Sequence, residues 1–329
     1  MPEAFEKVKN AVLSRVKRDI VGKDEVIDLA LITLLAGGHM LIDDVPGTGK
    51  TLLAKSFASA LSLSFGRIQC VPDLLPSDIT GINFFDMKLA EFRFVPGPVF
   101  VNILLADELN RAMPKTQAGL LECMEEGQVT IDGTTHPLPT PFMVIATQNP
   151  VETRGTFELP EAQLDRFMVK VSMGYPTHDE SIEIIERKLA YGDFESRALP
   201  ADTGSESDIS IDDITAAAAE LRATYICRDL IGYAASICEE TRQAGGVTLG
   251  AGPRALVHLI RVAQGYAAFT GRDYVLPDDI KKAAIPTLSH RLLFSNSFLR
   301  TREQGSETVG RILATLPVPS EQIDFSRRG

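Results

Sequence analysis

The chain is poor in the residues that build disulfide frameworks and zinc sites. Its 329 residues include four cysteines, five histidines and no tryptophan. The cysteines form no C-x-x-C pair, and the histidines make neither H-E-x-x-H nor another ligand spacing. A disulfide scaffold and a dedicated zinc site are therefore both disfavoured. Isolated cysteines are typical of a reducing cytoplasm, where they serve as small buried hydrophobic side chains.

The chain also lacks an excess of basic residues. Its 33 Lys and Arg residues against 44 Asp and Glu residues give a formal net charge of -11, and the sequence pI is near 5.0. Because binding to nucleic-acid phosphates depends on clustered Lys and Arg, this balance disfavours a nucleic-acid motor such as a helicase or clamp loader. The 44% share of hydrophobic residues suffices for one large core or two smaller ones in a soluble globular protein.

Long hydrophobic runs are absent as well. The N-terminal text "MPEAFEKVKNAVLSRVKRD" mixes charges of both signs into a helical apolar period, so we expect no signal peptide. The most apolar segment, Val26 to Ala36, contains Asp28 and ends at Gly37-Gly38, and it is too short to span a bilayer. We expect this segment to be an amphipathic helix that Asp24 caps and the glycine pair ends. These absences predict a cytoplasmic protein without membrane insertion.

An alternation of strands and helices extends from Met40 to about Tyr175. Short apolar runs rich in β-forming residues alternate with helical periods, as in parallel strands joined by crossover helices. The predicted strands are "HMLIDDV", "FGRIQC", "VNILLADE", "FMVIATQNP" and "RFMVKVSM", and the helices include "KTLLAKSFASAL" and "KTQAGLLECMEE". Strands this continuously apolar are buried on both faces, which predicts an α/β fold with a doubly wound parallel sheet.

Two insertions interrupt this alternation. The first, between Cys70 and Val99, is rich in Pro, Gly, Asp and aromatic residues, and it is too long for an ordinary connection and too apolar for a disordered one. The second, between Glu126 and Pro141, contains "TIDGTT", an Asp-Gly turn between β-forming residues that predicts a hairpin. The alternative is that either insertion is a loop that only covers the sheet.

The C-terminal part of the chain is helical in pattern. Residues 195–212 are polar and rich in Ser, Asp and Gly, which is typical of a linker. Helical periods follow up to Leu293. We therefore divide the chain into an α/β core with an N-terminal helix at residues 1–176, a connecting helix and polar linker at 177–212, and a smaller all-helical domain at 213–329.

The text "LIDDVPGTGKT", Leu41 to Thr51, contains most of a phosphate-binding loop. The pattern G-x-x-x-x-G-K-[ST] requires a glycine where this chain has Asp44. The cradle itself is made by backbone N–H groups at a helix N-terminus, by glycines and by a lysine. These parts are present as Gly47, Thr48, Gly49, Lys50 and Thr51. Since the loop follows an apolar strand and precedes a helix, we expect it to bind nucleotide phosphates rather than form a Gly-rich turn without function.

A pair of carboxylates ends another predicted strand. In "NILLADE", Asp107 and Glu108 follow a buried run and lie at the carboxyl end of the strand, where open α/β sheets place their ligands. Asp107 can hold Mg²⁺ through its water shell while Thr51 ligates it directly. Glu108 can polarise a water for attack on the γ-phosphate of a nucleotide. The alternative is that the pair only caps a helix.

Three more polar residues are candidates for the same site. Asn149 closes the strand "FMVIATQNP" and either positions the attacking water or forms a turn before proline. Arg166 lies near the end of a short helix, where the helix dipole stabilises a cation without any function. Arg254 falls in the first turn of a predicted helix, where the dipole disfavours a cation, which indicates an external anion beside it.

Together these motifs resemble the MoxR family of AAA+ ATPases. In order and spacing they match the family's Walker A, Walker B, sensor 1, arginine-finger and sensor 2 elements, in "DVPGTGKT", "LLADELNRA", "IATQNP", "LPEAQLDRF" and "GPRALVHLIRVAQGYAAFTGRDYVLPDDI". The resemblance runs from about Asp19 to Leu293, and it matches the two insertions to a helix 2 insert and a pre-sensor 1 hairpin. It implies an αβα core with a helical lid, ATP bound between them, and a ring that is usually a hexamer.

The resemblance also implies a role for each matching residue. Lys50 and Thr51 would bind phosphate and Mg²⁺, Asp107 would hold the metal, Glu108 would activate water, Asn149 would be sensor 1, Arg166 would reach the neighbouring subunit's ATP, and Arg254 would be sensor 2. Val21 and Gly22 in "DIVGKDEV" would pack on adenine, although the family commonly has Gln at the position of Lys23. Relatives with aspartate at position 44 still bind nucleotide. The family often has Gln-Glu-Gly where this chain reads "ETRGTF", so that Arg154 would face either an adjacent nucleotide or solvent.

From this resemblance we expect a Mg²⁺-dependent ATPase whose ring couples hydrolysis to the remodelling or metal-cofactor maturation of a client protein. Its partner would be a von Willebrand A-type protein, since the chain contains no such domain. Two alternatives stay open: a nucleotide-gated scaffold with negligible turnover, and a motor subunit similar to those of magnesium chelatase. The sequence does not indicate the client.

Overall fold

The computed structural model describes residues 3–45, 47–149, 155–191, 209–295 and 304–319. Arg154 and most of the predicted linker lie outside these ranges. In the described parts of the chain, no helix combines the length and the apolarity needed to cross a bilayer. All four cysteines are free and buried, as small hydrophobic side chains should be.

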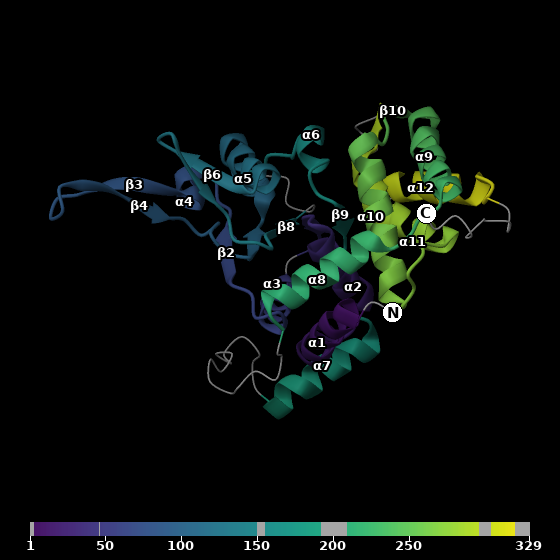
Figure 1. The fold of residues 1–329 in the computed structure, drawn as a ribbon, viewed down its shortest axis with the longest axis horizontal. Coiled ribbons are helices and arrows are strands. Elements are labelled where there is room, and N and C mark those ends of the chain that lie inside the picture. Colours follow the sequence, from purple (N-terminus) through teal and green to yellow (C-terminus); the bar gives the residue numbers. More distant parts are fainter. Residues whose placement is uncertain (1–2, 46, 150–154, 192–208, 296–303, 320–329) are drawn as a thin grey trace.

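A parallel five-stranded sheet forms the centre of the α/β core (Figure 1). Its order is β2-β5-β8-β1-β9, and neighbouring strands pair in parallel throughout. The strands are β1 (Met40–Asp43), β2 (Phe65–Gln69), β5 (Ile103–Asp107), β8 (Met143–Gln148) and β9 (Val169–Val171). All five lie within the predicted apolar runs, which confirms the predicted sheet.

Helices cover both faces of the sheet and make three layers. Alternate residues of a strand point to opposite faces, and here they enter two separate hydrophobic clusters: Met40 and Ile42 pack with α1–α3, while Leu41 packs with α5. The covering helices are α1 (Glu3–Asp19), α2 (Asp24–Ala36), α3 (Lys50–Ala60) and α5 (Pro114–Glu126). The predicted αβα core is therefore confirmed.

The helix α2 differs from its prediction in two respects. Asp24 is its first residue, and the cap position belongs to Lys23, whose backbone is left-handed with φ 64° and whose side chain makes no cap. The helix is not amphipathic, because most of its side chains from Val26 onwards are buried. It contacts α1, β9 and two helices of the C-terminal part, α8 (Ile211–Ala223) and α10 (Pro253–Phe269). Its end at Gly37, with φ 77°, is as predicted.

Both predicted insertions contain hairpins. One joins β3 (Gly81–Asp86) to β4 (Glu91–Pro96) after the short helix α4 (Pro76–Thr80), and the other joins β6 (Gln128–Ile131) to β7 (Thr134–Pro137). The Asp132-Gly133 turn has φ 50° and 81°, as a type I′ turn requires. The two hairpins meet where the Phe94 ring stacks on His136, with centroids 4.0 Å apart.

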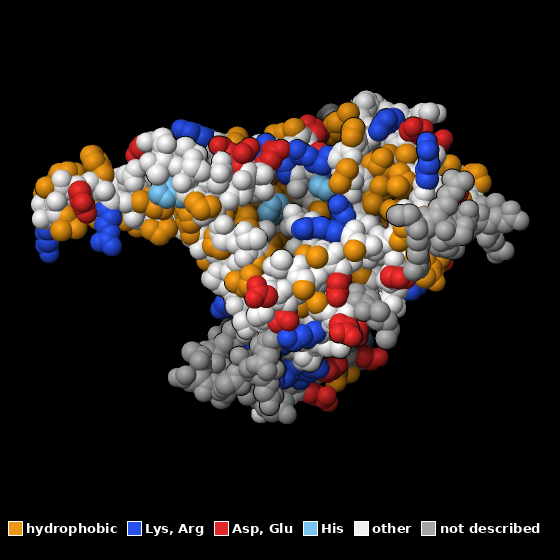
Figure 2. Space-filling view, viewed as in Figure 1, with side chains coloured by type: hydrophobic (Ala, Val, Ile, Leu, Met, Phe, Trp, Pro, Cys, Tyr) orange, Lys and Arg blue, Asp and Glu red, His pale blue; other side chains and the backbone are white. Residues whose placement is uncertain are grey.

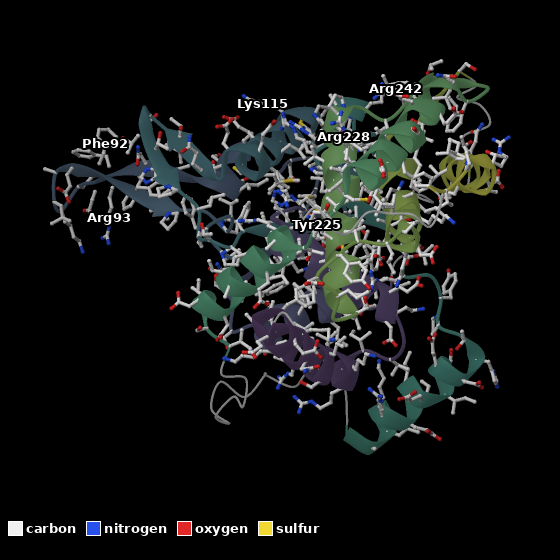
Figure 3. The ribbon with its side chains drawn as sticks, turned by 45° about the vertical axis from the view of Figure 1, so that its right-hand side comes forward. Phe92, Arg93, Lys115, Tyr225, Arg228 and Arg242 are labelled. Carbon is white, nitrogen blue, oxygen red and sulfur yellow. The ribbon has the colours of Figure 1, made fainter. Side chains whose placement is uncertain are left out.

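The β3–β4 hairpin projects away from the core (Figure 1). Figure 2 shows hydrophobic side chains along it. Phe92, near its far end in Figure 3, is 74% exposed. The same hairpin also exposes Phe85, Met87 and Leu89, and several exposed apolar side chains on one ribbon are typical of an interaction surface.

The C-terminal part is helical, with one addition. Its helices are α7 (His178–Tyr191), α8 (Ile211–Ala223), α9 (Arg228–Gln243), α10 (Pro253–Phe269), α11 (Pro277–Leu288) and α12 (Gln304–Thr315). A short antiparallel ribbon of β10 (Val247–Leu249) and β11 (Leu293–Phe294) joins them, where the sequence predicts only helices. α8 packs on α1, and its Glu220 accepts the N–H groups of Ala4 and Phe5 at 3.2 and 2.8 Å.

A buried histidine makes the fold sensitive to acid. The ring of His39, just before β1, accepts the N–H of Val144 at 3.0 Å and donates to the Met124 carbonyl at 3.0 Å. Burial lowers the pKa of His39 from 6.5 to about 4. Between these values the unfolded chain binds a proton here that the folded chain does not. His39 alone therefore lowers the free energy of unfolding by about 1.4 kcal/mol for each pH unit of acidification within that window, and above the window it causes no such loss.

We expect His39→Gln, whose amide does not titrate, to lose stability less steeply than the wild type between pH 6.5 and 4. Denaturant unfolding at several pH values in this window measures the two slopes. Equal slopes would contradict the role of His39, whatever the absolute stability of the variant.

Candidate nucleotide site

A cavity of about 800 Å³ lies at the carboxyl ends of β1, β5 and β8. Its size is in the range of small-molecule and cofactor pockets. Of the candidate residues, the structure brings these into its lining: Val21, Gly47, Thr48, Gly49, Lys50, Thr51, Asp107, Glu108 and Asn149. Gly22, Arg166 and Arg254 are not in the lining, and among the residues that the structure describes, those in the lining come from the range 19–188.

The phosphate-loop glycines leave open space where a phosphate would lie. Gly47 and Gly49 have φ 83° and 87°, and a Cβ built on either would meet nothing within 4 Å. Helix α3 begins directly after them at Lys50, so the N–H groups of its first turn are available to an anion. The ammonium of Lys50 donates to the loop's own carbonyls, Asp44 at 3.0 Å and Val45 at 3.2 Å.

Asp44, which replaces the first glycine of the pattern, anchors the loop from outside the cradle. Its side chain is 2% exposed. One oxygen accepts the N–H of Val45 at 2.7 Å, and the other accepts the N–H of Gly174 at 2.7 Å. The carboxylate thus ties the start of the loop to the segment after β9, which a glycine could not do.

Asp107 and Glu108 reach the cavity from the end of β5. Asp107 accepts the hydroxyl of Thr147 at 2.7 Å on one oxygen and pairs with Arg67 at 2.7 Å on the other. Glu108 has a left-handed backbone, with φ 55°, which costs a non-glycine residue on the order of 1 kcal/mol. Its N–H donates to the same Thr147 hydroxyl at 2.8 Å. This strained turn at the end of β5 leaves both consecutive carboxylates in the lining.

The donor set fits Mg²⁺. Thr51 and Asp107 line the same cavity, and Mg²⁺ takes one or two protein oxygens together with waters and phosphate oxygens. Asp107 already attracts a cation, the guanidinium of Arg67. The Asp107 carboxylate and the Thr51 hydroxyl would hold the ion of a bound nucleotide, since both offer hard oxygen atoms suited to it.

Beside the carboxylate pair the structure places Thr147 and Arg67, which the sequence interpretation missed. Thr147 is fully buried and forms hydrogen bonds with both residues of the carboxylate pair. In the sequence, the sign of this role is a hydroxyl residue inside an apolar strand, next to its polar last residue. Arg67 projects from the neighbouring strand β2, and only strand order reveals that it faces Asp107.

The side of the cavity that is expected to hold adenine is formed by the residues between α1 and α2 and by α7, which faces them. Val21 lines it together with Ile184 and Lys188 of α7. Gly22 is not part of this lining; it packs against the Glu180 side chain, which a Cβ at this position would strike. Lys23, where the family commonly has Gln, donates to the Tyr175 carbonyl at 3.1 Å.

The two candidate arginines lie together, away from the cavity. The carboxylate of Glu125, near the end of α5, pairs with Arg166 at 2.9 Å and with Arg254 at 2.6 Å. Asp165 lies 3.8 Å from Arg254. In Figure 1, α6 (Glu161–Leu164), which precedes Arg166, lies between α5 and α10. The anion that Arg254 requires at its helix N-terminus is therefore supplied within the chain, by Glu125.

Comparisons with known proteins agree with this geometry. The model of the ATPase family associated with various cellular activities (AAA) matches residues 39–169, and that of the AAA lid domain matches 239–312. The MoxR domain of the MoxR-vWA-beta-propeller ternary systems matches residues 6–70.

Full-length relatives are also found. The protein YeaC of Bacillus subtilis is 42% identical over 94% of both chains. Chaperone MoxR1 of Mycobacterium tuberculosis is 38% identical over 92% of this chain and 80% of its own. The crystal structure of a candidate ATPase from Cytophaga hutchinsonii superposes with a TM-score of 0.84 at 36% identity, covering 96% of each chain. On this evidence the chain belongs to the MoxR family of AAA+ ATPases.

Proposed function

We propose that this protein hydrolyses ATP with Mg²⁺ as a subunit of a ring, a hexamer as is usual in the family. It uses this hydrolysis to remodel or mature a client protein complex or metalloenzyme. Its place is the reducing cytoplasm, which its four free, buried cysteines suit.

The observation that carries this proposal is the separation of the cavity from the arginines. The cavity contains a phosphate loop, a metal-binding carboxylate and a candidate base, but neither Arg166 nor Arg254 lines it. A cation that neutralises charge on the transferred phosphate is worth roughly 10³ to 10⁵ in rate. A second copy of the chain that places its Arg166 and Arg254 at this cavity would complete the site, and such head-to-tail contacts close into rings.

Each residue of the cavity has a defined task in this proposal. Lys50 and the loop N–H groups hold the terminal phosphates, and Thr51 and Asp107 hold Mg²⁺, which supplies neutralisation of phosphate charge. Glu108 accepts the proton of the attacking water. Its carboxylate is held by Gln69 at 3.1 Å and Arg111 at 3.0 Å, and Asn149, nine-tenths buried, positions the same water from β8.

The relatives support a protein partner rather than a nucleic acid. The match at residues 6–70 is to the MoxR domain of systems that contain a von Willebrand A component, and one relative is named a chaperone. We propose a von Willebrand A-type partner, with the exposed apolar β3–β4 hairpin as a candidate contact for partner or client. The net charge of -11 makes nucleic acid an unsuitable partner.

The dependence of turnover on protein concentration tests the proposal. We expect the specific ATPase activity to rise with concentration as subunits assemble, because each site needs a neighbour's arginines. Phosphate release measured across the assembly range, with mass measured in parallel by light scattering, gives the two curves. A flat activity curve through assembly would favour the nucleotide-gated scaffold instead.

A further inference from the structure

Arg291 connects the C-terminal helices to the segment that carries Arg166. It lies in the short 3-10 helix Ser289–Arg291 after α11 and is 6% exposed. Its Nη2 donates to the carbonyls of Asp165 at 3.1 Å and Phe167 at 2.7 Å, and its Nε donates to the Asp165 carboxylate at 2.8 Å. One buried guanidinium therefore holds the backbone on both sides of Arg166.

The same guanidinium reaches the helix that carries Arg254. Its Nη2 contacts Nδ1 of His258 at 2.7 Å, and His258 lies one turn after Arg254 on α10. Burial, with the nearby charge of Arg291, lowers the pKa of His258 to about 3. The neutral ring accepts this hydrogen bond, so Arg291 ties together the two elements that present the arginines.

Arg166 is thus held at both ends. Glu125 pairs with its guanidinium at 2.9 Å, while Arg291 bonds to the residues before and after it. In the proposed ring a neighbour's phosphate would replace Glu125 as the partner of Arg166, and the guanidinium would lose its hold inside the chain. Only the backbone then determines where the side chain points, and the backbone is what Arg291 fixes.

We propose that Arg291 is a positioning residue that fixes, from the lid, the backbone on both sides of Arg166, so that Arg166 meets the nucleotide of the adjacent subunit in register for cleavage. The inference rests on the proposed function, in which Arg166 acts on a neighbour. A reacting group displaced by 1 Å can lose roughly 10²-fold in rate. Only an arginine has the planar fork that bonds several carbonyls at once, so lysine cannot replace it.

The test uses Arg291→Lys in the assembled protein, which keeps the charge and removes the fork. We expect kcat for ATP to fall by about 10- to 100-fold with KM unchanged. In an Arg166→Ala background, the same change should cause no further loss, because the group that it positions is gone. Single-turnover measurements at high protein concentration resolve the small residual rate.

Arg272→Lys is the matched control. Arg272 makes a two-bond pair with Asp279 in the same part of the chain, at 2.8 and 2.7 Å, so its loss perturbs the lid without touching Arg166. It should leave kcat within about twofold of the wild type. If Arg291→Lys fails to assemble, Asp165→Ala removes the carboxylate that accepts from Nε; it should show a smaller fall in kcat, because the two backbone carbonyls still accept from Arg291.

Three results would overturn the inference. The first is a kcat for Arg291→Lys no lower than that of Arg272→Lys. The second is an equal loss of kcat from Arg291→Lys with and without Arg166. The third, if Arg291→Lys cannot be assembled, is a wild-type kcat in Asp165→Ala. Failure of the proposed function gives a different result: Arg166→Ala itself would then turn over ATP like the wild type. Both the proposed function and the role of Arg291 would be refuted by that result.

Discussion

Glu108→Gln is expected to bind ATP with wild-type affinity and to turn it over roughly 10²- to 10⁴-fold more slowly than the wild type. Glutamine keeps the shape of the side chain and its bonds to Gln69 and Arg111 but cannot accept a proton from the attacking water. The phosphate loop, which includes Lys50, is untouched. Equilibrium binding of labelled ATP and steady-state phosphate release measure the two quantities separately.

The matched control is Glu240→Gln, which neutralises an exposed carboxylate of α9 that does not line the cavity. It should turn over ATP like the wild type. Wild-type phosphate release from Glu108→Gln would refute Glu108 as the base. Lost ATP binding in that variant would mean that its carboxylate serves the nucleotide site in another way.

Arg166→Ala should lose roughly 10³-fold or more in turnover, and mixing it with a second inactive variant should restore part of the activity. The second variant is Lys50→Ala, which removes the phosphate-binding ammonium. In mixed rings, the cavity of an Arg166→Ala subunit retains Lys50 and can receive Arg166 from a Lys50→Ala neighbour. With equal random mixing, roughly one quarter of the interfaces are complete, so about a quarter of the wild-type specific activity should return.

The control for this experiment is a mixture of Lys50→Ala and Glu108→Gln. Both changes damage the cavity itself, so every interface stays defective and no activity should return. If Arg166→Ala and Lys50→Ala also fail to complement while mixed rings are shown to form, the arginine does not act across an interface. Complementation in both mixtures would indicate exchange of whole active sites rather than a shared one.

The sheet and the cavity residues were predictable because they depend on local sequence. Buried parallel strands are continuous apolar runs, and Asp107, Glu108 and Asn149 stand where such runs end, at one edge of the sheet. The glycines of the phosphate loop are a local requirement of the same kind, for positive φ at Gly47 and Gly49. The Asp132-Gly133 hairpin turn follows from its two residues.

The errors have a common physical origin. The prediction for α2 assumed one apolar face, but α10 and α8 cover its other sides, and the sequence of α2 alone does not show what will pack on it. The β10–β11 ribbon was missed for the same reason, since its two strands are short and far apart along the chain. The partners of Asp44 and Asp107 also come from distant segments, at Gly174 and Arg67.

The sequence by itself determined that this protein has a phosphate loop, a carboxylate pair and an amide at the carboxyl edge of a parallel sheet, because residue type and strand end decide these features locally. Only the tertiary structure decided that Arg166 and Arg254 gather on Glu125, outside the cavity, and that Arg291 holds the backbone beside them. Such placements depend on how α5, α10 and the segment after α11 pack together, and no local pattern encodes a contact between segments this far apart along the chain.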